Sequence, residues 1–291
     1  MLFKEIKLRR RKSMKKTLIA LMMVLLSAML FVSCADEPSK YTVSFDLNGG
    51  TGDVPASQTV VEGEKATKPT IDPTPANTVY YKFAYWAKEG ETTEFDFSNG
   101  ITADTKLVAK WKDKYEVGDT GPAGGKIFYV VPESEGGTKT SEWGDDSLTW
   151  KYLEAATSNA TIGAGSDGRY EWRDSSSSAT CQTGTDIGSG WSNMKEITSK
   201  DNYASYFLAA NACATYGASG QSSDWFLPSK DELLELYRQK EYVGNFENSA
   251  YWSSSLSSTG NAAYSVSFTS GSADGNDTLY YERYVRPIRA F

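Results

Sequence analysis

A short acidic segment near the C-terminus has side chains that could bind a cation. Asp274, Asn276 and Asp277 lie within four consecutive positions, and carboxylate and amide oxygens are the ligands that calcium prefers. Their spacing is not that of an EF-hand, and Asp-Gly-Asn-Asp is also typical of a hairpin turn. We favour the turn and keep calcium at these three residues as the alternative. No other metal is expected.

Three arginines follow this segment and could capture an anionic group. Strand alternation would place Arg286 and Arg289, which are three positions apart, on opposite faces. A single cradle of three arginines is therefore not expected. Arg283 joins Asp274, Asn276 and Asp277 as a candidate ligand-binding residue.

Histidine is absent from all 291 residues. Its absence removes the Ser-His-Asp and Cys-His arrangements, the usual proton shuttle near neutral pH and the commonest zinc ligand. We predict no catalytic residue. An enzyme that uses carboxylates or tyrosine is the least favoured alternative.

The first of three cysteines, Cys34, ends a segment typical of export signals. Two lysines at 15–16 precede an apolar run at 18–32 that is short for a bilayer span. Residues 31–34, Phe-Val-Ser-Cys, resemble a bacterial lipobox, although Phe31 stands where leucine is usual. The resemblance implies cleavage and covalent attachment of diacylglycerol to Cys34.

This interpretation gives a signal peptide at 1–33 and a linker at 34–40, with translation starting at Met1 or Met14. An ordinary cleaved signal peptide is the alternative. Either way we expect export, and with the lipid the chain is anchored in a membrane of the cell envelope, at the outer membrane or cell surface.

The two remaining cysteines, Cys181 and Cys213, have two readings. In an oxidising compartment they would form a disulfide. The alternative is two buried thiols that pack as small hydrophobic side chains. Their spacing does not decide between the two.

Charge argues against a nucleic-acid partner. Residues 1–33 hold eight of the 30 basic and one of the 37 acidic residues, so residues 34–291 carry 22 basic and 36 acidic residues, a net charge of −14. Binding a polyanion relies on many Lys and Arg contacts. We therefore expect no nucleic acid and no broad docking on anionic polymers.

Residues 41–112 have the pattern of a small β domain. Strands are predicted at 41–47, 58–61, 80–87 and 106–111, and prolines confine the middle to loops. Its motifs Tyr-Thr-Val-Ser-Phe at 41–45, Tyr-Lys-Phe-Ala-Tyr-Trp at 81–86 and Leu-Val-Ala-Lys-Trp at 107–111 resemble the Listeria-Bacteroides repeat of bacterial surface proteins. The resemblance implies a β-grasp-like module. We interpret it as a spacer, with a binding module as the alternative.

Residues 115–291 form a second predicted domain. A strand is predicted at 126–131, a helix at 201–216, and a second helix after Pro228, where Ser229 and Glu232 form a capping box. The stretch 134–190 is interpreted as long loops anchored by tryptophans, namely Trp143, Trp150, Trp172 and Trp191. Trp225, Tyr251 and Trp252 would suit sugar stacking, but we favour packing.

Motifs at 224–233, 251–255 and 285–289 resemble the C-terminal domain of the Legionella collagen-like adhesin and, more distantly, fibrobacter major paralogous domains. The resemblance implies a C-type-lectin-like α+β fold. The sulfatase-modifying relatives use a late cysteine pair at a copper site, whereas this chain has no cysteine after Cys213, so that chemistry is not expected. We expect an α+β envelope lipoprotein whose C-terminal head binds a protein or glycan, with a purely structural envelope role as the alternative.

Overall fold

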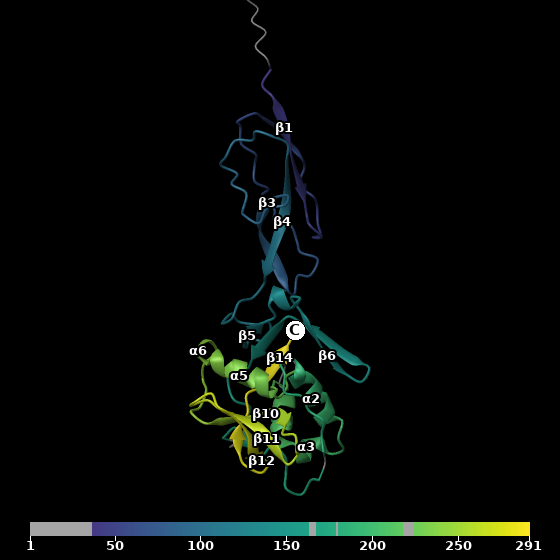
Figure 1. The fold of residues 1–291 in the computed structure, drawn as a ribbon, viewed down its shortest axis with the longest axis vertical. Coiled ribbons are helices and arrows are strands. Elements are labelled where there is room, and N and C mark those ends of the chain that lie inside the picture. Colours follow the sequence, from purple (N-terminus) through teal and green to yellow (C-terminus); the bar gives the residue numbers. More distant parts are fainter. Residues whose placement is uncertain (1–36, 163–166, 179, 218–223) are drawn as a thin grey trace, which may run out of the picture. The chain divides into compact units, whose positions relative to one another are not determined.

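The computed structural model describes residues 37–162, 167–178, 180–217 and 224–291 (Figure 1). They form two compact units. The first contains the described residues up to Thr74 together with Phe83–Lys110, and the second contains Pro75–Lys82 and Trp111–Phe291. None of the described helices is long and apolar enough to cross a membrane. Cys34 and the predicted signal peptide lie outside the described residues.

The first unit is built on a mixed four-stranded sheet. Its strands are β1 (Lys40–Asp46), β2 (Gln58–Val61), β3 (Tyr81–Lys88) and β4 (Thr105–Asp113), in the order β2-β1-β4-β3. The predicted strands are therefore confirmed. Alternation along β1 buries Val43 and Phe45, and the Phe45 ring meets Trp86 edge-on at 5.1 Å.

The expected β-grasp-like form of this unit is found only in part. The strand order, with β1 antiparallel to β2 and parallel to β4, agrees with it, but the described residues of the unit contain no helix on the sheet. The physical reason lies in the connection between β2 and β3, where Pro69, Pro73 and Pro75 exclude a regular helix.

The second unit contains three separate sheets. The largest has the order β12 (Ala273–Thr278), β11 (Ala262–Ser267), β10 (Ala250–Leu256), β13 (Arg283–Tyr284) and β9 (Arg169–Tyr170). A three-stranded sheet has the order β14 (Ile288–Ala290), β8 (Tyr152–Ala155) and β5 (Lys126–Val130). Strands β6 (Lys139–Trp143) and β7 (Asp146–Trp150) form a hairpin.

The helices of this unit are short. They are η1 (Glu133–Glu135), α2 (Ser189–Thr198), α3 (Tyr203–Tyr206), α4 (Leu208–Ala214), α5 (Lys230–Arg238) and α6 (Lys240–Val243). Helix α5 begins at the predicted capping box: the Ser229 hydroxyl accepts from the Glu232 N–H, and the Glu232 carboxylate accepts from the Ser229 N–H.

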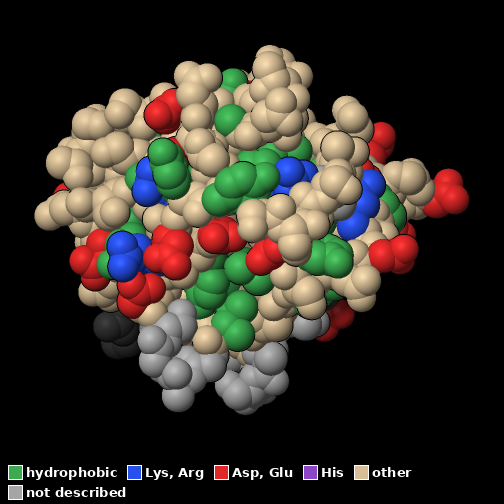
Figure 2. Space-filling view, turned by 90° about the horizontal axis from the view of Figure 1, so that it is seen from below, with side chains coloured by type: hydrophobic (Ala, Val, Ile, Leu, Met, Phe, Trp, Pro, Cys, Tyr) green, Lys and Arg blue, Asp and Glu red, His purple; other side chains and the backbone are tan. Residues whose placement is uncertain are grey.

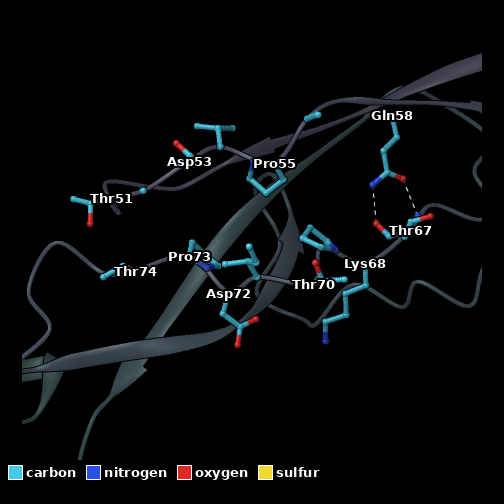
Figure 3. Close-up of a pocket in the computed structure, with 15 residues that line it drawn as sticks. Thr51, Asp53, Pro55, Gln58, Thr67, Lys68, Thr70, Asp72, Pro73 and Thr74 are labelled. Carbon is cyan, nitrogen blue, oxygen red and sulfur yellow. Dashed lines mark hydrogen bonds between the residues drawn. The ribbon is translucent and has the colours of Figure 1, made fainter.

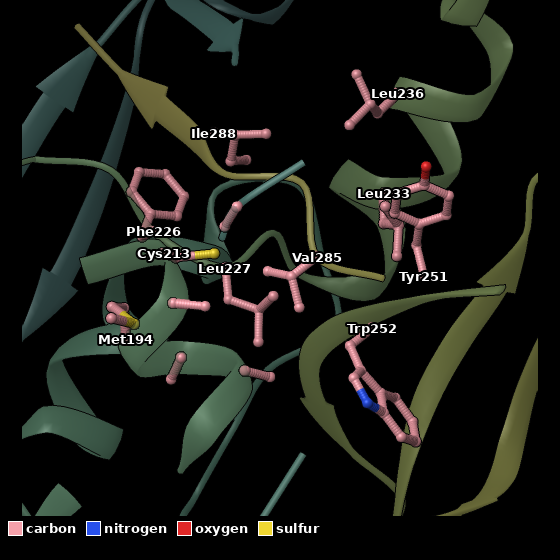
Figure 4. Close-up of a cluster of buried hydrophobic side chains, with 14 of the residues drawn as sticks. Met194, Cys213, Phe226, Leu227, Leu233, Leu236, Tyr251, Trp252, Val285 and Ile288 are labelled. Atoms are coloured by element: carbon pink, nitrogen blue, oxygen red, sulfur yellow. The ribbon is translucent and has the colours of Figure 1, made fainter. Parts of the chain in front are cut away.

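A single buried cluster joins the sheets to the helices (Figure 4). Side chains of α4, α5, β10 and the C-terminal segment meet in it, including Cys213, Leu233, Tyr251 and Val285. Two buried tryptophans have partners for their indole N–H groups: Trp172 donates to the Ser253 carbonyl at 2.7 Å and Trp252 to the Tyr170 carbonyl at 2.8 Å. Tyr251 and Trp252 are thus core residues.

The predicted α+β, C-type-lectin-like fold class is wrong. Strands outweigh helices, and they form several separate sheets. Two segments account for the difference. The stretch read as long loops contains β6, β7 and β8, and the helix predicted at 201–216 divides into α3 and α4. The break falls at Phe207, which is fully buried against Trp172 with ring centroids 5.6 Å apart.

Candidate functional site

The predicted binding residues near the C-terminus do not form an open loop. Residues 273–278 are strand β12, which pairs with β11 across a bulge, so the predicted hairpin turn is wrong at this position. Asp274 and Asn276 are exposed, whereas the Asp277 carboxylate points inward. The structure therefore separates the three side chains that sequence proximity had grouped.

The Asp277 carboxylate is hydrogen-bonded to other side chains of this protein. Its carboxylate accepts two hydrogen bonds from the Arg283 guanidinium, at 3.0 and 2.9 Å, and one from the Ser265 hydroxyl at 2.6 Å. The Asp274 carboxylate instead accepts from the Asn276 N–H. Among the described residues no group of three His, Cys, Asp or Glu side chains gathers as a metal site. Asp277 and Arg283 therefore stabilise the strand rather than present a free charge.

The other two arginines are also used internally. The buried Arg286 guanidinium donates to the Asn159 side chain and to the carbonyls of Ala156 and Gly244. Arg289 pairs with Asp224 at 2.6 Å and with Glu154 at 3.3 Å. As expected from their spacing, these arginines do not form one anion cradle.

Cys181 and Cys213 are both buried free thiols in the core of the second unit. The disulfide alternative is not formed, and the two side chains pack as the other alternative requires. Burial raises the pKa of Cys181 to about 11 and that of Cys213 well above its usual value. Both thiols are therefore poor nucleophiles at neutral pH.

The second unit holds a pocket of about 300 Å³ whose chemistry suits a ligand. One wall is a single face of helix α2, because positions 191, 194, 195 and 198 repeat at helical spacing. The other wall is the segment before α5. The lining residues are Trp191, Met194, Lys195, Thr198, Ala214, Asp224, Trp225 and Phe226.

Strand β14 fixes the second wall of this pocket. The Phe226 main chain exchanges hydrogen bonds with Ile288 at 2.7 and 3.0 Å. Just before this bridge in the chain, Asp224 pairs with Arg289 and the Trp225 ring meets Tyr216 edge-on at 5.4 Å. The position of Trp225 is therefore set by contacts far away in sequence.

Trp225 has a buried polar group without a partner among the described residues. Only 3% of the residue is exposed, and its indole N–H has no hydrogen-bond partner in the described part of the chain. Leaving such a donor unsatisfied costs about 1–3 kcal/mol, and buried indole N–H groups usually find an acceptor. Trp225 also lines the pocket, so a ligand there would contact this residue.

The charged groups at this pocket are already neutralised. The Lys195 ammonium pairs with Asp146 at 3.1 Å and lies 5.1 Å from the centre of the Trp191 ring, and Asp224 pairs with Arg289. Figure 2 shows one face of the molecule, on which acidic, basic and hydrophobic side chains are interspersed. The pocket therefore favours an uncharged ligand with an apolar face and oxygen acceptors.

The sequence predicts Trp191 as an anchor of a loop and Trp225 as a packing residue. It does not predict that the two side chains line the same pocket. The helical spacing of residues 191–198 was the signal that could have predicted one lining face. Only the contact between residues 224–226 and β14 reveals the other.

Comparison with known proteins identifies one segment of the chain. Residues 41–110 match the family model of the Listeria-Bacteroides repeat domain. This match confirms the repeat expected from the strand motifs, and it ends where the first unit ends. No curated protein matches the chain.

Proposed function

We propose that this chain is an exported, lipid-anchored envelope protein whose second unit binds an uncharged saccharide in the pocket between Trp191 and Trp225. Residues 1–33 direct export, Cys34 carries the lipid, and the Listeria-Bacteroides repeat acts as a spacer. The observation that carries the binding proposal is the buried indole N–H of Trp225, which has no partner among the described residues, in a pocket that the partly exposed Trp191 ring also lines. Sugars offer both an apolar ring face and oxygen acceptors.

The test is binding of the full chain to an array of neutral and sulfated glycans. We expect saturable binding to neutral glycans that changes little between low and high salt, because the charged side chains among the described lining residues are paired within the protein. Trp225→Phe removes the N–H and keeps most of the ring, and we expect about tenfold weaker binding from the lost hydrogen bond. Trp191→Ala should weaken binding by a similar factor.

Tyr280→Ala is the matched control, because Tyr280 is an exposed aromatic side chain that does not line this pocket. It should leave glycan binding unchanged. Thermal unfolding of each variant checks that the fold is intact. If the folded parent chain binds no glycan, or if Trp225→Phe binds as the parent does, the saccharide proposal fails and a structural envelope role takes its place. Binding confined to a protein would also overturn it.

A further inference from the structure

The first unit contains a groove between two extended segments, 51–58 and 67–74 (Figure 3). The segments run antiparallel and are fastened at both ends. Thr51 and Thr74 exchange main-chain hydrogen bonds at 2.7 and 3.3 Å. At the other end the Gln58 carboxamide donates to the Thr67 carbonyl and accepts from the Thr67 N–H, both at 2.7 Å.

Between these two fastenings the segments do not form a ladder. Among the described residues no main-chain hydrogen bond joins 52–57 to 68–73. Pro55, Pro69 and Pro73 account for this, because each lacks the N–H that a ladder needs. The gap is a groove of about 450 Å³. The two segments are therefore hydrogen-bonded to each other at both ends but not in the middle.

The groove is edged by apolar side chains that the fold does not cover. Ile71 is 81% exposed and Val54 is 57% exposed, and both line the groove. Exposed apolar residues that gather beside a concave surface are typical of a binding site. The main chain beside the groove also has N–H and C=O groups that do not bond to the opposite segment.

The charges of the groove are unevenly placed. Asp53 and Asp72 lie toward the Thr51–Thr74 end, whereas Lys68 lies near Thr67 (Figure 3). Among the described residues neither Asp53 nor Asp72 has an ion-pair or hydrogen-bond partner. Lys68 is 3.8 Å from Glu94. Free carboxylates at one end complement a basic group on a ligand.

We propose that this groove binds an extended peptide segment of a partner protein. Seven residue steps separate 51 from 58 and 67 from 74, which is about 23 Å at roughly 3.3 Å per residue. The peptide is therefore about seven residues long, apolar in its middle, and carries Lys or Arg where it meets Asp53 and Asp72. Apolar side chains provide contact area, and unused main-chain groups recognise its backbone. The repeat is then more than a spacer.

The test is selection of a randomised peptide library displayed on phage, using the full chain and, in parallel, its Ile71→Asp variant. Ile71 is too exposed for this change to disturb the core. We expect the parent to enrich peptides with an apolar centre and a basic end. Synthetic copies should bind Ile71→Asp at least tenfold more weakly than the parent. They should bind the double variant Asp53→Asn/Asp72→Asn several-fold more weakly, with the difference reduced at high salt.

Two controls match these variants. Val79→Asp places the same charge at an apolar residue that is 49% exposed in the second unit, and Glu62→Gln/Glu64→Gln removes the same net charge from exposed residues outside the groove. Both should bind as the parent does. Equal enrichment on the parent and Ile71→Asp, or selected peptides without a basic end, would overturn the proposal. Trp225→Phe should retain peptide binding, so the outcome is separable from that of the saccharide test.

Discussion

Two buried carboxylates are held by main-chain amides from glycine-containing loops. Glu154 accepts from the Gly125 N–H at 2.6 Å and from the Ala123 N–H. Glu232 accepts from the N–H groups of Ser229 and Gly188, at 2.7 and 2.9 Å. The glycine-rich loop at 117–125, which lacks the lysine of a phosphate loop, thus encloses a carboxylate of the protein itself. Gly121 and Gly125 are needed there, because a Cβ at either position would lie within 3 Å of Glu154 side-chain atoms.

Gly125→Ala should destabilise the second unit strongly. A Cβ at this position would lie 2.3 Å from the Ala155 carbonyl oxygen and 2.8 Å from Glu154 Cγ, and a main-chain carbonyl in a sheet cannot move aside cheaply. We expect a loss of about 3 kcal/mol in the free energy of unfolding, measured by urea denaturation. Gly124→Ala is the control: it has open space but a φ of +83°, so only about 1 kcal/mol is expected. Equal losses would contradict the steric argument.

Glu232 should make stability depend on pH near neutrality. Burial raises its pKa to about 7, although the amides of Ser229, Gly188 and Gly190 act in the opposite direction. A carboxyl whose pKa is higher in the folded state favours folding in its protonated form. Its contribution is fully present below about pH 4.5 and is lost as the pH rises through about 7.

Glu232→Gln should remove this pH dependence. The amide NH₂ cannot accept a hydrogen bond from the Ser229 N–H. We therefore expect the free energy of unfolding to fall by about 1–3 kcal/mol at pH 5. The decrease should be smaller at pH 8, where the parent protein is itself less stable. Urea denaturation at the two pH values measures both. Glu235→Gln, on the same helix but partly exposed, is the control. If Glu232→Gln instead costs more stability at pH 8 than at pH 5, the pKa of Glu232 is not raised in the folded state.

In two elements of secondary structure, packing and pairing contacts override the local sequence pattern. Residues 273–278 have the composition of a turn, yet they form strand β12 because β11 supplies a partner and Arg283 neutralises the inward Asp277. The helix predicted at 201–216 breaks because Phe207 packs on Trp172, while the Ala209 N–H donates to the Glu171 carbonyl.

Asp277→Asn should therefore destabilise the five-stranded sheet. The substitution leaves the partly buried Arg283 without its carboxylate partner. We therefore expect the free energy of unfolding to fall by about 2 kcal/mol. Asp274→Asn, at an exposed residue of the same strand, should change the free energy of unfolding by less than about 0.5 kcal/mol. Calcium should not raise the Tm of the parent, because the Asp277 carboxylate is occupied. A calcium-dependent rise in Tm that Asp277→Asn abolishes would restore the cation site.

In the molecule as a whole, each of the two compact units carries one of the two proposed binding sites. The pocket of Trp191 and Trp225 belongs wholly to the second unit, and the groove between 51–58 and 67–74 belongs wholly to the first. Each proposal can therefore be tested by variants in one unit while the other unit serves as the internal control.

The membrane attachment of the whole chain should depend on Cys34. In cells that express Cys34→Ser, we expect the protein to lose its lipid label and to move from the membrane fraction to the soluble fraction, because diacylglycerol supplies the anchor. Cys181→Ser, at a buried free thiol, should remain with the membranes. Retention of Cys34→Ser in the membrane fraction would contradict a lipid anchor at this residue.

Features that depend on neighbouring residues could be predicted from the sequence. Alternation placed the strands of the repeat, and the Ser229–Glu232 pair placed the start of α5, because strand faces and helix caps are set within a few positions. Only the tertiary structure shows that residues 273–278 pair with β11, that the predicted helix breaks at Phe207, and where the pocket and the groove lie. The break and the pocket depend on residues far apart in the chain, as the contacts of Phe207 with Trp172 and of Phe226 with Ile288 show. Local sequence patterns do not predict which distant segments will meet.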